Sequence, residues 1–586
     1  MLNGLRLERP RLYLRPGRIS ALLDASRTDA FLARLIGALV DGSAGIVPEP
    51  PADFRIVGPR MLKQSQTILK RVSSLALACL LTGEERFGRR AVEELLNAAA
   101  FPHWNESHFL DTAELCNAFA IGYDWLYPRL TDAERRAIRT AMVEKGLKPG
   151  LVCHESGAWW TSCHHSWNLV CNGGLLAGAL ALADEESELC ETIVETALNK
   201  LPLAMKTYGP DGGWEAGPDY WEYATQYAVF AIDAMETALG RDDGLSRSPG
   251  FSRTGLFPID CSGNLDLYFN FADSQTVHGP RPVYFWLGRK FSMAECIGEN
   301  RRLLEKHIQS GGFPDAFDIA WYEPAARDAT GQQGRARTYR GIETAFLRSR
   351  WKDPEAVFVG FKGGSNQADH AHLDLGSFVF DAFGVRWAAD LGPDDYDIPG
   401  YWDMKEGGDR WRLFRLANFS HNTPVLNGDL QRSGASASLI RTGTTGSASF
   451  AVMDLSGAYL PHAGSVHRGI ALFEDGTTVV QDEIAWLGPE RRVRWQVMTD
   501  AQIALSGSEA VLTQNGRTLT AKIRAPAGAR FIELSGHREP PENPNRGFRL
   551  LAADHVETGE TTTFCVVLQA GSAEVELPPL REWGRG

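Results

Sequence analysis

The hydrophobic period of this chain changes once, and that change limits the folds it can adopt. From Met61 to about Leu239, apolar residues recur at three- and four-residue spacing, as in helices that bury one face. After about Gly311 the long helical runs stop, and short segments rich in β-branched and aromatic residues replace them. The sequence therefore predicts a helical domain over 1–315 and an antiparallel β domain over 316–586.

Repetition within the first domain predicts how its helices are arranged. The helical period is clearest in Leu62–Leu81, Arg89–Ala99, Asp111–Tyr127, Asp132–Lys145, Leu169–Leu182 and Glu188–Met205. Thr131 and Glu134 form a capping-box pattern that marks the start of one helix. Residues 75–85 resemble residues 175–186, and repeated helix pairs of this sort predict an α/α toroid.

Turn residues support the β assignment of the second domain. The strand-like segments are Ala356–Phe361, Ser377–Phe380, Gly469–Phe473, Thr477–Gln481 and Thr563–Leu568. Asp475-Gly476 and Asn515-Gly516 place a glycine where a hairpin turn needs positive φ. We expect hairpins there, a β-sandwich of several sheets, and a loop over Ala325–Arg337 near the junction.

Composition excludes some classes of protein. With 44% hydrophobic and 23% charged residues, the chain has the balance of a globular protein. A net charge of −13 argues against nucleic-acid binding, although a local arginine cluster can still hold an anionic substrate. No apolar run approaches the roughly eighteen residues of a membrane helix. We therefore expect neither a nucleic-acid nor a membrane partner.

The N-terminus and the cysteines bear on the compartment. Met1 to Arg18 contains no continuous apolar core, so we identify no signal peptide. Nine cysteines without metal-type pairing predict free thiols, such as Cys79 and Cys171 in apolar helices. Both observations favour the cytoplasm, but a periplasmic or secreted chain trimmed of its signal would show the same features.

Histidines and an aspartate in the β domain form a candidate metal-binding set. His370 and His372 are separated by one residue, and we expect them on one face of an extended segment. Asp390 follows the next apparent strand, and His421 comes later in the chain. Imidazole and carboxylate groups of this kind suit zinc or a similar divalent ion.

Two aromatic stretches in the helical domain have the composition of a sugar-binding cleft. The first contains Trp160, His164, His165, Trp167 and Asn168, and the second contains Trp214, Glu215, Tyr220 and Tyr223. Indole and phenol rings pack against sugar rings, while the polar groups between them can bind hydroxyl or acidic groups. Simple packing of aromatic loops would explain the same composition.

Together these motifs resemble the heparinase II/III-type polysaccharide lyases over nearly the whole chain. The resemblance rests on His370-Ala-His372-Leu-Asp-Leu-Gly-Ser-Phe, Ala389-Asp390-Leu-Gly, Ser420-His421-Asn422-Thr423, Glu215-Ala-Gly-Pro-Asp-Tyr220-Trp and Trp167-Asn168-Leu-Val-Cys-Asn-Gly-Gly. It implies a toroid followed by a β-sandwich and the cleavage of a uronic-acid-containing polysaccharide. The same architecture serves heparan, chondroitin and alginate lyases, so the substrate is less closely specified than the fold.

The resemblance implies roles for individual residues. Tyr220 and His370 match the catalytic tyrosine and histidine. His372, Asp390 and His421 match residues that hold a structural metal, and we expect zinc. An unperturbed phenol titrates near pH 10, so Tyr220 needs either a lowered pKa or a role as the acid that protonates the leaving oxygen.

Other roles are less closely specified by the resemblance. Relatives often have an Asn-His or Asn-Asn pair where this chain has Cys163-His164-His165, so His164, His165 and Asn168 all remain candidates for contact with the substrate carboxylate. The remaining candidates for substrate binding are Trp160, Trp167, Trp214, Glu215, Tyr223 and Arg415. Assembly into a homo-oligomer stays open.

Three alternatives accompany a lyase of glycosaminoglycans such as heparan sulfate, chondroitin sulfate or hyaluronan. The first is an alginate or oligoalginate lyase on the same fold. The second is a glycoside hydrolase, which needs a pair of carboxylates, and Asp111 and Glu215 are the candidates. The third is a carbohydrate-binding protein without catalysis. The absorbance of an unsaturated product distinguishes a lyase from the last two.

Overall fold

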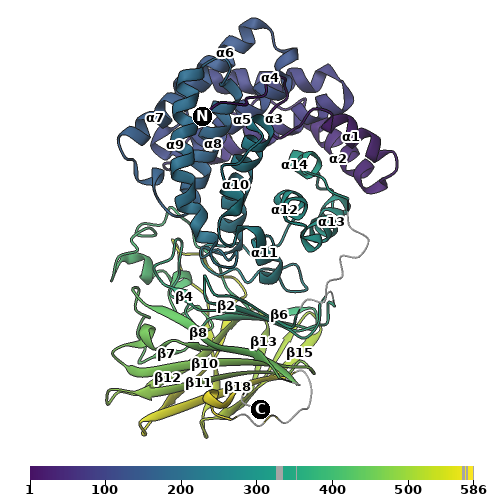
Figure 1. Ribbon diagram of the computed structural model, residues 1–586. Helices are drawn as coiled ribbons and strands as arrows, with labels where there is room; N and C mark the ends of the chain where they lie inside the picture. Colours follow the sequence, from purple (N-terminus) through teal and green to yellow (C-terminus); the bar gives the residue numbers. More distant parts are fainter. Residues whose placement is uncertain (325–333, 352, 446, 570–574, 576–577, 585–586) are drawn as a thin grey trace. The chain divides into compact units, whose positions relative to one another are not determined.

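A computed structural model of the protein covers residues 1–586 (Figure 1). It describes all of them except 325–333, 352, 446, 570–574, 576–577 and 585–586. The chain divides into two compact units. The helical unit comprises Met1–Gly212, Trp221–Leu256 and Gly279–Thr330, and the β-rich unit comprises Gly213–Tyr220, Phe257–His278 and Gly331–Gly586. Two short segments from within the predicted toroid, 213–220 and 257–278, thus cluster with the β-rich unit, and a domain boundary at 315/316 stays a prediction.

Helices make up most of the first unit, as the period predicts. They are α1 (Arg18–Ser26), α2 (Ala30–Ile46), α3 (Leu62–Thr82), α4 (Glu85–Ala99), α5 (Phe109–Leu126), α6 (Asp132–Met142), α7 (Lys148–Glu155), α8 (Ser166–Leu182), α9 (Ser187–Met205), most of α10 (Gly217–Leu239), α12 (Val283–Phe291), α13 (Ala294–Gln309) and α14 (Ala316–Ala320). The first four residues of α10 and nearly all of α11 (Leu256–Cys261) belong to the β-rich unit. The capping box at Thr131 and Glu134 is present at the start of α6. All six predicted helical segments are confirmed, with ends shifted by a few residues.

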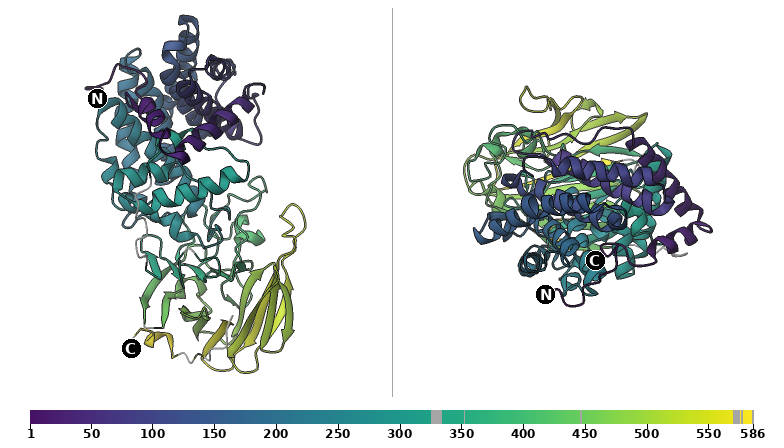
Figure 2. Two further views of the ribbon diagram at one scale, coloured as in Figure 1. Left: turned by 90° about the vertical axis from the view of Figure 1, so that its right-hand side faces the viewer. Right: turned by 90° about the horizontal axis from the view of Figure 1, so that it is seen from above.

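The helical unit is built around two buried helices. Every residue of α5 is buried, and nearly every residue of α8 is. α5 packs against α3 and α8, and α8 packs against α9, in the α/α toroid that the repeat predicted (Figures 1 and 2). Gly174 permits the close approach of α8 to α5, because a Cβ there would lie 2.3 Å from the carbonyl oxygen of Ala113.

Antiparallel strands make up the second unit. They are β1 (Ala336–Tyr339), β2 (Thr344–Arg348), β3 (Phe358–Lys362), β4 (Gly364–Ser365), β5 (Phe378–Ala382), β6 (Val385–Ala388), β7 (Val425–Leu426), β8 (Ser436–Thr444), β9 (Ala448–Asp454), β10 (Ala463–Phe473), β11 (Thr478–Trp486), β12 (Arg492–Thr499), β13 (Gln502–Ser506), β14 (Glu509–Gln514), β15 (Arg517–Ala525), β16 (Arg530–Ser535), β17 (Arg549–Val556) and β18 (Thr561–Gln569). They form sheets in the orders β1-β2-β3-β5-β6, β13-β14-β15-β18-β11-β10-β9-β8-β4 and β16-β17-β12-β7.

A single apolar core joins the three sheets. It includes Phe378 from the first sheet, Val480 from the second and Trp495 from the third, all buried. Both predicted hairpins are confirmed: the turn at Asp475-Gly476 joins β10 to β11, and the turn at Asn515-Gly516 joins β14 to β15. Gly476 and Gly516 have φ of 90° and 73°, the left-handed conformation that these turns require.

Two local predictions are corrected. His370 and His372 do not lie on an extended segment, because they belong to the loop before β5 and His370 has φ of 59°. Ala336 and Arg337 belong to strand β1 rather than to a loop, while residues 325–333 of the same predicted loop lie outside the described residues. In each case a tertiary contact outweighs the local pattern.

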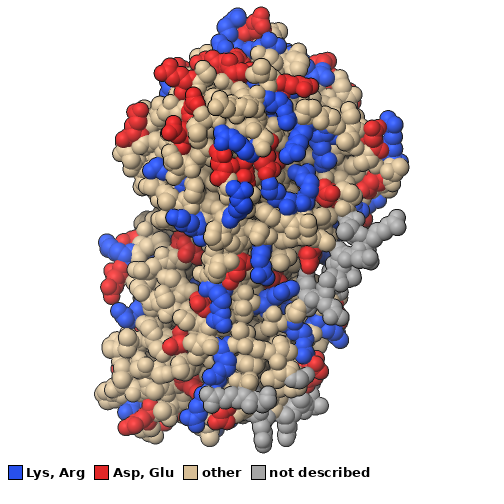
Figure 3. Space-filling model, viewed as in Figure 1, with Lys and Arg blue, Asp and Glu red and all other residues tan. Residues whose placement is uncertain are grey.

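Acidic and basic side chains are interspersed on the face that Figure 3 shows. Within the described ranges, none of the helices combines the length and the apolar character needed to cross a membrane. Cys79 and Cys171 are buried free thiols, as predicted.

Candidate functional site

A buried carboxylate organises the candidate site in the β-rich unit. Asp273 accepts hydrogen bonds from Nδ1 of His370 at 2.7 Å and from Nε2 of His372 at 2.9 Å. The hydroxyl of Tyr401 donates to it at 2.5 Å, and the guanidinium of Arg410 donates at 3.3 Å. One aspartate therefore fixes the ring orientation of both histidines, and its bonds leave Nε2 of His370 and Nδ1 of His372 for other partners.

Backbone contacts hold the histidine loop in its unusual conformation. The buried Arg410 donates to the carbonyl oxygens of His370 and Ala371, as well as to Asp273. A positive φ at a non-glycine residue such as His370 costs free energy and persists only where surrounding contacts hold it. Here those contacts turn both imidazoles toward one carboxylate, which an extended strand would not do.

A pair of tyrosines meets the first histidine. The ring of Tyr220 stacks on the ring of His370, with centroids 3.8 Å apart. The Tyr220 hydroxyl lies 2.6 Å from the Tyr396 hydroxyl. The ring of Trp402, which is 47% exposed, contacts both His370 and Tyr396 edge-on. Phenol hydroxyls, an imidazole and an exposed indole thus converge at one place, as proton transfer on a sugar would require.

The protonation of this cluster follows from burial and charge. Burial alone would raise the pKa of Asp273, but hydrogen bonds from His370 and His372 and the charge of Arg410 outweigh it and hold that pKa well below its usual range. Burial raises the pKa of Tyr220, and the negative charge of Asp273 raises it further. The hydrogen bond with Tyr396 lowers that pKa but does not offset the rise. Of the two expected roles of Tyr220, a raised pKa therefore favours the proton donor.

The predicted metal ligands are brought together next to this cluster. One ligand atom from each of His372, Asp390 and His421 lies within 4.8 Å of the others, and all three residues are buried. Nδ1 of His372 and Nε2 of His421 are buried and have no hydrogen-bond partner among the described residues. Since such nitrogens are costly to bury unpaired, the donor set fits a bound cation.

Packing within the helical unit involves several of the other predicted residues. Trp160 is buried and stacks on Phe109, so packing explains its ring, whereas its neighbour Trp159 is 58% exposed. Trp159 in turn contacts the half-buried Trp167 and stacks near His165. Packing therefore accounts for Trp160, and the exposed face of Trp159 is better placed for a sugar.

The candidates for contact with the substrate carboxylate differ in availability. The amide nitrogen of Asn168 is buried and donates to the carbonyl oxygens of Cys163 at 3.0 Å and Lys200 at 3.3 Å. His164 is exposed, and its Nδ1 lies 3.2 Å from the carbonyl oxygen of Leu203. Asn168 thus shapes this loop, while the exposed His164 and the half-buried His165 remain predictions for the carboxylate contact.

Three further predicted binding residues lie in the β-rich unit. Trp214 is buried, and Glu215 is half-buried. The half-buried Arg415 donates to the side-chain oxygen of Asn545 at 2.8 Å and to the carbonyl oxygen of Pro393 at 2.6 Å. These bonds use Nε and one Nη of the guanidinium, so two of its three nitrogens already have partners in the protein.

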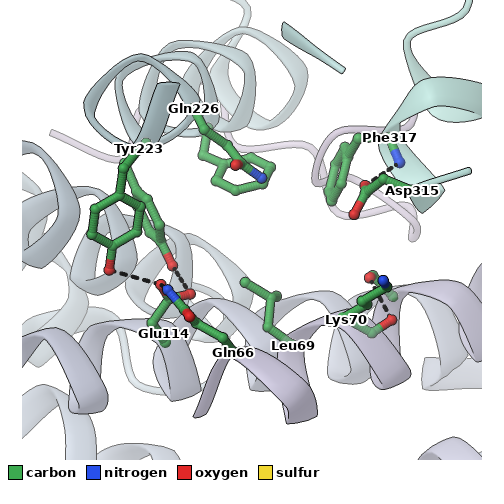
Figure 4. A pocket seen from close by; sticks show the side chains of 11 residues that line it. Gln66, Leu69, Lys70, Glu114, Tyr223, Gln226, Asp315 and Phe317 are labelled. Carbon is green, nitrogen blue, oxygen red and sulfur yellow. Dashed lines mark hydrogen bonds between the residues drawn. The ribbon is translucent and has the colours of Figure 1, made fainter. Parts of the chain in front are cut away.

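Tyr223 lies in a different setting, a pocket of the helical unit (Figure 4). Its hydroxyl donates to the buried carboxylate of Glu114 at 2.8 Å, and Tyr227 donates to the same carboxylate at 2.5 Å. The nitrogen of Gln66 adds a third bond at 3.2 Å. Its commitment to Glu114 makes Tyr223 a weak rival of Tyr220 for proton transfer.

The carboxylate pair considered for a hydrolase is not supported by the surroundings of Asp111. That side chain is fully buried and accepts bonds from the Met61 backbone at 2.7 Å and the Asn105 amide at 2.6 Å. Its other oxygen lies 3.0 Å from Nδ1 of His108. Asp111 therefore joins segments of the toroid and does not present a carboxyl group to a glycosidic bond.

Sequence reasoning missed several residues of the site. They are Asp273, Tyr396, Tyr401 and Trp402. The run Tyr396-Asp-Ile-Pro-Gly-Tyr401-Trp402 has the same aromatic and turn-forming composition as the stretch around Tyr220, and that likeness could have identified it. Asp273 is a single aspartate in an irregular segment, and nothing local distinguishes it.

Comparison with known proteins identifies the β-rich unit. Residues 355–564 match the family model described as heparinase II/III-like, C-terminal. This part of the chain is therefore similar to the C-terminal domain of heparinase II/III-like proteins, which agrees with the motifs. No curated protein matches the sequence.

Solved structures share the fold of the whole chain. The heparan sulfate lyase HepC mutant from Pedobacter heparinus is 14% identical, with a TM-score of 0.59 over 97% of this chain and 92% of that one. The heparinase III BT4657 gene product is 12% identical, with a TM-score of 0.59 over 94% and 93%. A crystal structure of heparinase III is 12% identical, with a TM-score of 0.62 over 91% and 84%. The predicted toroid-plus-β architecture is thereby confirmed.

Proposed function

We propose that this protein is a polysaccharide lyase that cleaves uronic-acid-containing polysaccharides by β-elimination. The observation that carries the proposal is the cluster in which Tyr220 stacks on His370 and shares a 2.6 Å hydrogen bond with Tyr396. Asp273 orients the histidine through a hydrogen bond from Nδ1. This cluster lies in the unit that carries the heparinase II/III-like domain.

The residues divide the proton transfers of the elimination. Because Nδ1 of His370 donates to Asp273, Nε2 carries the lone pair and can accept the C5 proton of a uronate. Electrons from the C5–H bond form the C4–C5 double bond as the C4–O4 bond breaks. The protonated Tyr220 donates its hydroxyl proton to the departing O4, and Tyr396 can replace that proton through their shared bond.

Charge develops on the substrate carboxylate as the proton leaves, so a donor must stabilise it. His164 and His165 stay predictions for this donor, whereas the Asn168 amide nitrogen already donates to two backbone carbonyls. Groups placed for acid–base transfer contribute on the order of 10²–10⁴-fold in rate.

The metal in this proposal is zinc, held by His372, Asp390 and His421. The orphaned nitrogens of the two histidines and the nearby carboxylate form a donor set typical of zinc. A bound zinc ion there would supply structural cross-linking of the β-rich unit rather than chemistry. Elemental analysis of the purified protein tests this directly, with about one zinc per chain as the expected result.

The proposed substrate is a glycosaminoglycan such as heparan sulfate, chondroitin sulfate or hyaluronan. The support is the fold shared with proteins described as heparan sulfate lyase and heparinase III. Alginate and oligoalginate remain the alternative, because a uronate with a leaving group at C4 is the common chemical requirement.

A panel of heparan sulfate, chondroitin sulfate, hyaluronan and alginate tests the proposal. Cleavage by β-elimination gives an unsaturated uronate, which absorbs in the ultraviolet, and we expect this absorbance with at least one glycosaminoglycan. Cleavage without the absorbance would indicate hydrolysis, and binding without cleavage would indicate a carbohydrate-binding protein. Either result would overturn the lyase assignment.

A further inference from the structure

The helical unit contains a pocket that the elimination chemistry does not use. Its volume is about 180 Å³, and it lies among α3, α5, α10 and the start of α14. Figure 4 shows Gln226 and Phe317 on one side of it and Gln66, Leu69 and Lys70 on the other. This is the room of roughly six water molecules at about 30 Å³ each, which suits one sugar ring rather than a chain segment.

One wall of the pocket is apolar. Phe230 and Phe317 are buried, with ring centroids 4.8 Å apart and a T-shaped arrangement, and Leu69 faces them as a half-buried residue. The C–H face of a pyranose packs on surfaces of this kind, since aromatic and aliphatic groups exclude water from it. The apolar wall therefore provides the packing half of a sugar site.

Polar groups also line the pocket: an amide, phenols and carboxyl groups. The Gln226 amide is half-buried and has no hydrogen bond to another described residue, so it offers a donor and an acceptor to a ligand. The Glu114 carboxylate and the Tyr223 hydroxyl lie along the same pocket in a fixed pair. Hydroxyl and acetamido groups can be recognised by amide, phenol and carboxyl groups of this kind, which together supply donors and acceptors.

The charges in the pocket select against an anionic sugar. Lys70 provides one ammonium group, whereas Glu114 and Asp315 provide two carboxyl groups. Sites that hold sulfate or carboxylate use a surplus of cationic donors, often arginine in bidentate geometry. This pocket has no such surplus among the residues that line it.

We propose that the pocket is a subsite for a single uncharged pyranose residue, such as an N-acetylhexosamine. The identity of that sugar as a unit of the polymer rests on the proposed lyase function. Binding of the monosaccharide itself does not, because it requires the pocket and no bond cleavage. The consequence is a preference for polymers whose hexosamine carries no sulfate at this position.

Equilibrium binding of monosaccharides to the full chain tests the subsite. N-acetylglucosamine, N-acetylglucosamine 6-sulfate and glucuronate are titrated separately and followed by ligand-observed NMR. We expect N-acetylglucosamine to bind at least several-fold more tightly than the two anionic sugars. Equal binding of all three, or tighter binding of either anion, would overturn the proposal.

Variants locate that binding. Gln226→Ala removes the free amide at a half-buried position and should weaken N-acetylglucosamine binding several-fold. Gln309→Ala, an exposed amide at the end of α13, is the matched control and should leave it unchanged. Unchanged binding in Gln226→Ala, with an unchanged melting temperature, would place the sugar elsewhere.

Adding a charge gives an independent measurement. Gln226→Lys should strengthen the binding of N-acetylglucosamine 6-sulfate relative to that of N-acetylglucosamine, and an unchanged ratio of the two affinities would contradict the proposed contact. If the protein binds N-acetylglucosamine in this pattern but releases no unsaturated product, the lyase assignment is wrong and the subsite is still supported. The reverse result would sink the subsite alone.

Discussion

Two buried carboxyl groups, Asp273 in the β-rich unit and Glu114 in the helical unit, show how hydrogen-bond partners determine the pKa of a buried acid. Both are buried and both accept several hydrogen bonds. Imidazoles and the cationic Arg410 surround Asp273, and their combined effect lowers its pKa despite burial. Burial raises the pKa of Glu114, and its phenol and amide donors reduce that rise without reversing it.

The difference extends to the tyrosines nearby. Tyr220 and Tyr223 are three residues apart on α10, yet their hydroxyls face different groups. Tyr223 donates to Glu114, so its proton is committed to a structural bond. Tyr220 lies against Tyr396 and the ring of His370, and the proposed mechanism uses its proton to protonate the leaving oxygen. Their positions on the helix alone would not show that the two hydroxyls have different partners.

We expect the largest difference between the two units when the hydroxyl of Tyr220 or of Tyr223 is removed. Tyr220→Phe keeps the ring and its stacking on His370, so the fold should survive while turnover falls by about 10²–10⁴-fold. Tyr223→Phe should leave kcat within a few-fold and lower stability by about 1–2 kcal/mol, because Glu114 loses a donor. Product absorbance and thermal melting measure both effects.

Retention of activity would break this assignment. If Tyr220→Phe keeps more than about a tenth of wild-type turnover, the barrier has risen by less than about 1.4 kcal/mol. The hydroxyl would then not be the acid, and the role would pass to Tyr396, Tyr223 or a histidine.

Substitution of His370 should affect turnover much more than the stability of the β-rich unit. His370→Ala should reduce turnover by about 10²-fold, since it removes the proposed base. The melting temperature should fall only slightly, because His372, Tyr401 and Arg410 still donate to Asp273. A large drop in melting temperature would instead assign His370 to the structural set.

Metal removal should destabilise the β-rich unit more than it slows the chemistry. A ligand present at a hundredfold excess over its Kd stabilises the native state by about 2.7 kcal/mol, which corresponds to roughly 5–10 °C in Tm. Chelation and His421→Ala should each produce a shift of this size. Their effects should not add, because both remove the same ion.

Two findings would reject the metal site. One is the absence of stoichiometric metal in the purified protein, and the other is a His421→Ala variant that melts like the parent. Found together, they would leave Asp390 and His421 as an ordinary buried ion pair, whose 3.0 Å contact is already present.

Local patterns predicted most of the fold and part of the site. The three- and four-residue period located the helices, and Asp475-Gly476 and Asn515-Gly516 located two hairpins, because each is decided within a few residues. The metal-ligand group was found from residue type and motif, and the structure brings its members together.

What sequence reasoning missed depends on contacts between distant segments. Asp273 meets His370 across 97 positions of sequence, and Tyr220 meets Tyr396 across 176. The local hydrophobic period of a sequence does not predict contacts between residues so far apart in the chain. The loop conformation of His370 was missed for the same reason, since Arg410 and Asp273 hold it against the extended geometry that alternation suggests.

The pH dependence of stability gives the smallest expected effect and the closest test of the comparison. Burial raises the pKa of Glu114 in the native state above the value of about 4.3 that a glutamate has when unfolded, and the charge of Asp111 adds to the rise. Between those two values the native state binds a proton that the unfolded chain does not. The stabilisation is therefore fully present below about pH 4.3 and is lost as pH rises through the native pKa.

Glu114→Gln removes this titration while keeping an uncharged group of the same shape beside Tyr223 and Tyr227. The unfolding free energy of the variant should fall less steeply with rising pH than that of the parent, by a slope below the roughly 1.4 kcal/mol per pH unit of one whole proton. Denaturant unfolding from pH 4 to pH 8 measures the two slopes. Parallel curves would show that Glu114 is ionised throughout, and its phenol and amide partners would then hold a charge as well as the cationic partners of Asp273 do.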